Sequence, residues 1–295
     1  MHAPVVKTLI VTADDFGLSK QVNEAVERAH RDGILSAASL MAGAPAQEDA
    51  VHRARELPEL GVGLHVTLLD GRPVLPPSEI PGLVGSNGRF FTDPVRFGIA
   101  LYFSPDLRAQ ARAEIAAQFR RFRETGLTLD HINGHKHFHL HPVVLQTILQ
   151  IAPSFGSPPI RAPFEPFAAS YAAGRDRALG RLTSGAFYRL QTQRLARKLK
   201  QAGIASNDYV FGLNDSGAMT EQLILSFIEH LPPGITELYC HPSIARWDGA
   251  DNLPADYRPE EEFQALVSPA VKAKLAASGL QPQNFRAACG RGLEP

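Results

Sequence analysis

Short apolar runs alternate with helical patterns along most of the chain, and this alternation constrains the fold more than any other feature. Short apolar runs are typical of buried strands, and strands that alternate with helices are typical of βα units around a parallel sheet. The predicted strands cover residues 5–12, 36–41, 61–66, 127–132, 160–161, 209–211 and 236–240. The predicted helices cover residues 19–33, 45–57, 104–124, 143–151, 220–230 and 269–278. The pattern therefore predicts an α/β protein.

The domain organisation follows from the length and from two interruptions of this rhythm. The chain has 295 residues, which suits one α/β barrel of ~250 residues as well as two smaller domains. Residues 71–104 are rich in Pro and Gly and are expected to form a long loop. Residues 170–203 form a second irregular stretch, in which Leu residues lie at loosely helical spacing among many Lys and Arg side chains. Neither stretch is typical of a linker, so we predict one domain over residues 1–295 with irregular insertions at about 71–104 and 170–203.

The composition excludes several classes of protein. Hydrophobic residues make up 44% and charged residues 20% of the chain, which allows a large core and argues against a disordered protein. Lys+Arg and Asp+Glu both number 30, so a nucleic-acid partner is not expected. The two cysteines, Cys240 and Cys289, cannot form a disulfide framework. Neither a signal peptide nor an apolar stretch of ~18 residues is visible, so the expected location is the cytoplasm.

Polar residues with catalytic or metal-binding chemistry follow five of the predicted strands. They are Asp14 and Asp15, His65, the histidine-rich run 131–141, Arg161, and His241. In α/β barrels and doubly wound sheets, ligands bind at the carboxyl ends of the strands. These residues are far apart in the sequence, but we expect them to converge on one rim of the sheet.

The acidic pair and His65 each have a structural as well as a functional interpretation. Neighbouring side chains of a strand point apart, so one carboxylate of Asp14 and Asp15 could bind a metal while the other faces a reacting water. Alternatively, one of them caps the following helix. His65 lies in an apolar strand, where a histidine is more often a hydrogen-bonded core residue than a ligand.

The run 131–141 holds five histidines in eleven residues, a density typical of metal sites. If the run is helical, His135 and His139 share one face. If it is extended, His135, His137, His139 and His141 share one face. Spacing alone does not decide between these two arrangements.

The kind of metal site is narrowed by the residues that are missing. The chain has no second cysteine at the spacing of a structural zinc site, and it lacks the motifs of serine hydrolases, P-loop proteins and dinucleotide-binding proteins. An open site with carboxylate and imidazole ligands leaves positions for water and substrate, as in hydrolytic metal centres.

Four strings together resemble the YdjC-like carbohydrate deacetylases, a family that includes chitooligosaccharide deacetylases of the ChbG type. They are TADDFGLS (12–19), VGLH (62–65), DHINGHKHFH (130–139) and ELYCHP (237–242), in the order of the family. Four further strings resemble the hopanoid-biosynthesis (HpnK-type) branch: LSAASLM (35–41), DGRPVLPP (70–77), HKHFHLHP (135–142) and PIRAPFEP (159–166).

The resemblance implies an irregular (β/α) barrel, similar to the distorted TIM barrel of NodB-like and YdjC-like deacetylases. It also implies one divalent metal ion, Zn²⁺ or Mg²⁺. Carried over by motif, the metal ligands are Asp15, His65 and His135, and the catalytic base is Asp14.

The more distant similarity to the NodB-like polysaccharide deacetylases implies two further roles. His241 would be the general acid, and Arg161 would orient the catalytic base. The family often has a second histidine directly after the last ligand, where this chain has Lys136, so no role is carried over for that position. His137 and His139 are kept as candidates for contact with the substrate or with the residues that support the catalytic and metal-binding side chains.

The activity implied by the resemblance is hydrolysis of the N-acetyl group of an N-acetylglucosamine moiety. In the hopanoid branch the substrate would be a glycosylated hopanoid lipid, and the products would be a glucosaminyl hopanoid and acetate. Residues 97–103 and 175–200 would then offer peripheral contact with the inner membrane; otherwise they pack as a lid or as a homodimer contact. The alternatives are a soluble chitooligosaccharide (diacetylchitobiose) deacetylase and a non-catalytic sugar- or metal-binding module.

Overall fold

The computed structural model describes residues 7–174, 178–247 and 253–290. Within them, six parallel strands form one sheet in the order β4-β3-β2-β1-β6-β5. The strands are β1 (Lys7–Phe16), β2 (Ala37–Leu40), β3 (Gly61–Val66), β4 (Ile132–Gly134), β5 (Tyr209–Phe211) and β6 (Gly234–Cys240). Because all six strands are parallel, their carboxyl ends lie together at the same end of the sheet.

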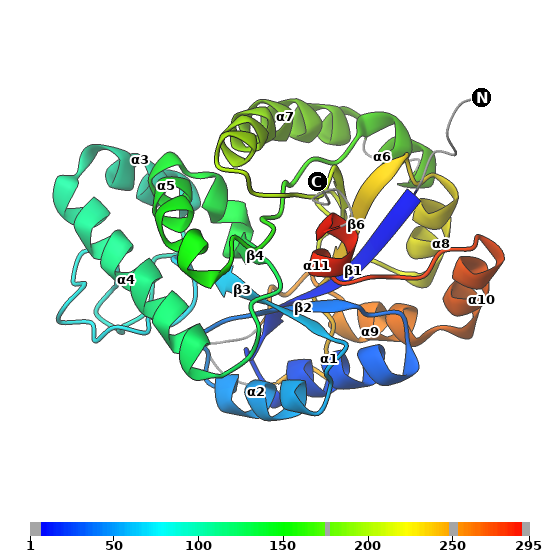
Figure 1. Cartoon of the computed structure of the whole chain (residues 1–295), viewed down its shortest axis with the longest axis horizontal. Helices are drawn as coiled ribbons and strands as arrows, with labels where there is room; N and C mark the ends of the chain where they lie inside the picture. Colours follow the sequence, from blue (N-terminus) through cyan, green and yellow to red (C-terminus); the bar gives the residue numbers. More distant parts are fainter. Residues whose placement is uncertain (1–6, 175–177, 248–252, 291–295) are drawn as a thin grey trace.

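Helices surround this sheet (Figure 1). They are α1 (Lys20–Asp32), α2 (Gln47–Arg55), α3 (Pro94–Phe103), α4 (Pro105–Glu124), α5 (Pro142–Ile151), α6 (Phe167–Gly174), α7 (Ala178–Gln201), α8 (Glu221–Glu229), α9 (Pro259–Val267), α10 (Pro269–Ala277) and α11 (Phe285–Gly290), with 3₁₀ turns η1 (His135–Leu140) and η2 (Ala152–Phe155). None of the helices described is both long and apolar enough to cross a membrane.

The expected barrel is confirmed only as far as a curled parallel sheet. The segment 159–164 lies between the two edges of the sheet and is hydrogen-bonded to both. On one side the Arg161 N–H donates to the carbonyl of Ile132 in β4, and on the other the Val210 N–H of β5 donates to the carbonyl of Phe164. The predicted strand 160–161 is therefore a single bridge, Ile132 to Ile160, in an otherwise extended connection.

Several elements match the prediction because local chemistry specifies them. The strand at 61–66 has the predicted bounds. The Ser19 and Ser104 hydroxyls accept backbone N–H groups at the starts of α1 and α4, as their positions before helical patterns suggested.

Other elements differ from the prediction. The stretch 71–104 contains α3, whose first turn is capped by Asp93, and 170–203 contains most of α6 and all of α7. The strand predicted at 127–132 begins only at Ile132, and α9 and α11 lie where no helix was predicted.

Side chains of β1 divide the core into two parts. Leu9, Val11 and Ala13 pack in the large cluster between the sheet and the helices. Ile10 packs on the opposite side with Phe285 of α11, which closes the amino-terminal end of the sheet interior. Since side chains alternate along a strand, the interior row continues towards Asp14 at the carboxyl end of β1.

Candidate metal centre and active site

Both acidic side chains at the end of β1 enter the same site. The register between β1 and β2 shifts between Ala13 and Phe16, and Asp15 has a left-handed φ of 61°. As a result, one oxygen of Asp14 lies 3.9 Å from His65 Nδ1, and one oxygen of Asp15 lies 3.3 Å from His65 Nε2. The expectation that the two carboxylates point apart is therefore wrong, because the irregular backbone turns Asp15 back towards the interior.

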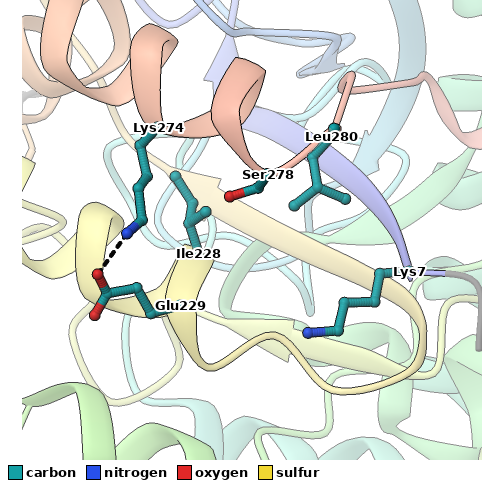
Figure 2. A pocket seen from close by; sticks show the side chains of 7 residues that line it. Lys7, Ile228, Glu229, Lys274, Ser278 and Leu280 are labelled. Carbon is teal, nitrogen blue, oxygen red and sulfur yellow. Dashed lines mark hydrogen bonds and ion pairs between the residues drawn. The ribbon is translucent and has the colours of Figure 1, made fainter.

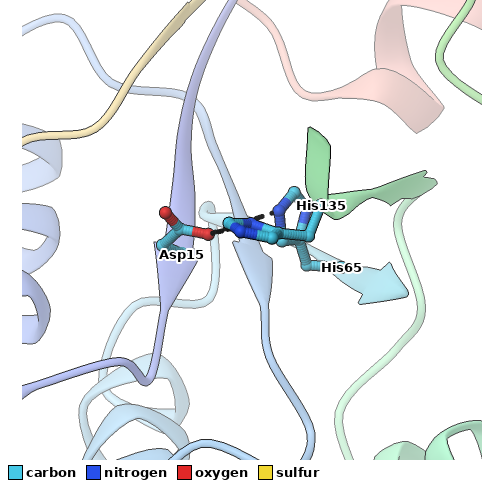
Figure 3. A group of neighbouring side chains, drawn as sticks. All are labelled: Asp15, His65 and His135. Carbon is cyan, nitrogen blue, oxygen red and sulfur yellow. Dashed lines mark hydrogen bonds and ion pairs between the residues drawn. The ribbon is translucent and has the colours of Figure 1, made fainter. Parts of the chain in front are cut away.

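Asp15, His65 and His135 come together as a potential metal-binding group (Figure 3). Each offers one ligand atom, and these atoms lie within 4.8 Å of one another. His135 Nδ1 is 3.0 Å from Asp15 Oδ1. Burial raises the pKa of the Asp15 carboxyl, but the charge of His135 and its hydrogen bond to Asp15 oppose this shift, and the pKa is well below its usual value.

Asn133 determines which ring nitrogen of His65 carries the proton. Its Nδ2 group donates to Asp14 Oδ1 at 3.1 Å, so its Oδ1 must accept the hydrogen bond from His65 Nδ1 at 2.6 Å. His65 Nε2 then carries a lone pair that faces the carboxylate of Asp15. Two acceptors in this position repel unless a proton or a metal ion lies between them. Asp15, His65 and His135 therefore fit a divalent cation.

Asp14 is held by a buried guanidinium group. Arg161 donates to both Asp14 oxygens at 2.6 and 3.0 Å and to both Glu237 oxygens at 2.8 and 2.6 Å. Arg161 and Glu237 are fully buried. Burial raises the pKa of the Asp14 carboxyl, but the charge and the hydrogen bonds of Arg161 outweigh this effect and hold the pKa well below its usual value. Asp14 is therefore ionised at neutral pH and presents fixed acceptor oxygens.

We expect Arg161→Met to lower the free energy of unfolding by about 3–5 kcal/mol, because two buried carboxylates lose their partner. Urea denaturation at neutral pH measures this loss. Asp14 has a lower pKa in the folded state, so the stability from its pairing is present above pH ~4 and is lost as the pH falls below its unfolded pKa. The difference between wild type and Arg161→Met should therefore narrow in acid. Equal stability of the two proteins at neutral pH would contradict this account.

The histidine run adopts neither of the two predicted arrangements. Lys136 and His137 have left-handed φ angles of 52° and 55°, so successive histidines turn in different directions. His137 lines the cavity, with Nε2 3.3 Å from the Tyr239 hydroxyl. His141 caps α5 through its side chain and contacts the Gly98 carbonyl instead of the site.

Of the two contacts expected for His139, the structure shows the one with a supporting residue. Its side chain is completely buried and is not part of the cavity lining; Nε2–H donates to the Arg161 carbonyl at 3.0 Å. Burial lowers the pKa of His139 to about 3, although the hydrogen bond opposes this shift. His139 is thus a neutral residue that positions the backbone of Arg161.

His241 follows β6 and reaches the same cavity as the acidic pair. Its backbone N–H donates to Glu262 at 2.5 Å, and its ring lies 5.6 Å from that of Tyr239 and 5.0 Å from that of Tyr257. Burial lowers the pKa of His241, while the charges of Asp15 and Asp14 oppose the shift. Among the described residues, Nδ1 has no hydrogen-bond partner.

The cavity above these residues has a volume of about 570 Å³. Tyr188, Tyr239 and Tyr257 contribute aromatic surface to it. Asp70 and Lys136 contribute charge and form an ion pair at 2.6 Å. Aromatic faces beside polar groups are suited to a ring that has one apolar face and many hydroxyl groups.

A second cavity, of about 450 Å³, lies at the amino end of β1 beside Lys7 (Figure 2). Its Lys274 is paired with Glu229 at 2.5 Å. The side chains described there include no histidine or cysteine. Metal-binding and acid–base chemistry therefore point to the cavity at the carboxyl ends of the strands.

Comparison with known proteins identifies the family. Residues 8–277 match the family described as YdjC-like protein. The chain belongs to the YdjC-like family. A protein named carbohydrate deacetylase from Geobacillus stearothermophilus is 32% identical over 278 residues, which cover 94% of this chain and 96% of that protein. Another protein of the same name, from Vibrio parahaemolyticus serotype O3:K6, is 29% identical. That alignment covers 95% of this chain and 95% of that protein.

One solved structure shares the fold of this chain. It is a protein of Enterococcus faecalis V583 whose suggested role is cellobiose-phosphate cleavage. It superposes with a TM-score of 0.71 at 23% identity, covering 96% of this chain and 99% of that one. At this identity the likeness concerns the fold alone.

Three residues of this YdjC-like site were not found by sequence reasoning: Asn133, Glu237 and Asp70. Glu237 gave a signal, because it is a lone carboxylate in the apolar strand β6, where an unpaired charge would be costly. Asn133 and Asp70 gave none, since an Asn at a strand end and an Asp before a Gly are typical of turns.

Proposed function

We propose that the chain is a metal-dependent N-deacetylase that acts on N-acetylglucosamine units of chitooligosaccharides. The observation that carries this proposal is the juxtaposition of two differently held carboxylates. Asp15 lies with two imidazoles, whereas Asp14 is held by Arg161 and Asn133. A protein that only binds a metal or a sugar needs the metal-binding group that contains Asp15, but it does not need a second, separately held carboxylate such as Asp14. The names of the two relatives, both aligned over almost the whole chain, support deacetylation of a carbohydrate.

The residues of the site take complementary parts in hydrolysis. A divalent cation held by Asp15, His65 and His135 would polarise the amide carbonyl and acidify a water molecule. Asp14 accepts the proton of the water as its oxygen bonds to the carbonyl carbon. Arg161 keeps Asp14 ionised and oriented for this transfer.

Cleavage of the carbon–nitrogen bond requires a second proton transfer. An amine cannot leave as an anion, so a proton must reach the nitrogen, and protonated His241 donates it. A lowered pKa makes this ring a stronger acid towards nitrogen once it is protonated. Such transfers contribute typically ~10²–10⁴-fold to the rate. The products are acetate and the free amino sugar.

Acetate release from N,N′-diacetylchitobiose tests the proposed function. We expect release by the metal-loaded protein, loss of release after treatment with a chelator, and recovery when Zn²⁺ or Mg²⁺ is returned. Release that is unaffected by the chelator would overturn the metal-dependent mechanism. A metal-loaded protein that binds the sugar without releasing acetate would favour the binding module.

A glycolipid is the second candidate substrate, and exposed apolar side chains beside the cavity favour it. Val95, Ile99 and Phe103 of α3 are 68%, 58% and 75% exposed and recur every four residues, so they lie on one face. Pro94, at the start of the same helix, lines the cavity. This α3 face could contact a bilayer while the cavity takes the N-acetylglucosaminyl group of a lipid such as a hopanoid.

For this second candidate, we expect replacement of Val95, Ile99 and Phe103 by Ser to spare deacetylation of diacetylchitobiose. The same triple variant should act at least tenfold more slowly on an N-acetylglucosaminyl lipid in vesicles, because the apolar contact area is lost. Acetate release from both substrates measures the difference. An equal effect on both would argue against a role of the α3 face in lipid access.

A further inference from the structure

A buried chain of hydrogen bonds runs from the metal-binding group into the sheet interior. Asn133, which holds His65 and Asp14, also donates from Nδ2 to Ser39 Oγ at 2.8 Å. Ser39 Oγ lies 3.0 Å from His131 Nε2. His131 Nδ1 lies 2.9 Å from Asp130 Oδ2. Ser39, His131 and Asn133 are completely buried, and Asp130 is 3% exposed.

The direction of every hydrogen bond in this chain follows from its far end. Asp130 accepts backbone N–H groups from Phe285 and Arg286 at 3.1 and 3.0 Å, as an ionised carboxylate does. His131 Nδ1 must therefore be the donor to Asp130, and in the neutral imidazole this leaves Nε2 as an acceptor. The Ser39 hydroxyl then donates to His131 and accepts from Asn133.

Two glycines of the surrounding sheet leave space for these hydrogen-bonded side chains. A Cβ atom at Gly63 would lie 2.4 Å from His131 Nε2, and one at Gly61 would lie 2.5 Å from Asp130 Oδ2. The ring of His131 also stacks on Phe285 at a centroid distance of 4.3 Å. Two glycines of β3 thus leave room for a charged and a polar side chain that a core would otherwise exclude.

We propose that Ser39, His131 and Asp130 are positioning residues that set the metal affinity of His65 through Asn133. Ser39 and Asp14 both accept hydrogen bonds from Asn133 Nδ2. A flip of the Asn133 side-chain amide would place its oxygen against these two acceptors, so the amide keeps its orientation. His65 therefore keeps its proton on Nδ1 and its lone pair on Nε2, where the metal binds. An amide does not relay protons, so the chain acts through orientation. This inference rests on the proposed metal site.

Ser39→Ala tests the proposal, with Ser36→Ala as the matched control. Both serines are buried and lie close together in the sequence, but the Ser36 hydroxyl exchanges its hydrogen bonds with the backbone of Val11 and does not touch the chain of hydrogen bonds that ends at Asn133. We expect Ser39→Ala to weaken Zn²⁺ binding by about 10–100-fold, the usual effect of losing a residue that orients a ligand. Ser36→Ala should change it less than threefold. Competition with a chromophoric chelator measures both dissociation constants without substrate.

His131→Phe provides a second variant, because it keeps the stack on Phe285 and removes the acceptor for Ser39. We expect it to weaken Zn²⁺ binding as Ser39→Ala does. In the zinc-loaded wild type, nitrogen NMR of the histidine rings should find His131 and His65 both protonated on Nδ1. Protonation of His131 on Nε2, or Zn²⁺ binding by Ser39→Ala as tight as by Ser36→Ala, would overturn the proposal. Because these readouts need no turnover, they stand even if the protein deacetylates no sugar.

Discussion

Neither His65→Ala nor His135→Ala is expected to bind a divalent cation tightly or to release acetate from an N-acetylated sugar. Each change leaves Asp15 with a single imidazole, and three protein ligands are the usual minimum of a catalytic zinc site. Elemental analysis of the purified variants measures the metal content. His65→Ala should have the larger effect on the site, because it also removes the donor to Asn133.

His52→Ala is the control for both variants, since His52 is an exposed residue of α2 outside the site. It should keep the metal and the full activity. If His65→Ala and His135→Ala both retain the metal content of the wild type, the assignment of the ligands is wrong.

Asp14→Asn and Asp15→Asn should separate the base from the metal ligand. Asp15→Asn should lose the metal, because a neutral amide is a weaker ligand for a divalent cation than a carboxylate. Asp14→Asn should keep the metal and the affinity for substrate, but kcat should fall at least ~10²-fold, because an amide cannot accept the proton of the attacking water. Metal content, substrate affinity and kcat of both variants are the required measurements.

The outcomes for this pair are distinct. Loss of metal from Asp14→Asn together with its retention by Asp15→Asn would mean that the two roles are exchanged. Full activity of both variants would show that the end of β1 does not carry the chemistry. Asp14→Asn also removes a charge opposite Arg161, so its folding should be checked by circular dichroism; Glu237 still pairs with the guanidinium group.

The parts of the fold that were predicted correctly are those specified by local chemistry. Ser19 and Ser104 precede helices because their hydroxyls cap the first turn, and the apolar run 61–66 forms the buried strand β3. The loop expected over 71–104 was only partly right, because Pro and Gly in that stretch hid the helix α3. The loosely helical spacing of Leu residues in 170–203 corresponds to α7.

The sequence by itself determined that chemically active residues would gather at the carboxyl ends of parallel strands, because that edge is common to all of them. It thus predicted that Asp14, Asp15, His65, His135 and His241 would meet, as they do around one cavity. Only the tertiary structure decided how each of them is used. The turn of the histidine run depends on left-handed residues at 136 and 137, and the setting of His65 depends on a buried amide. Such contacts join distant segments, and no spacing within a single segment encodes them.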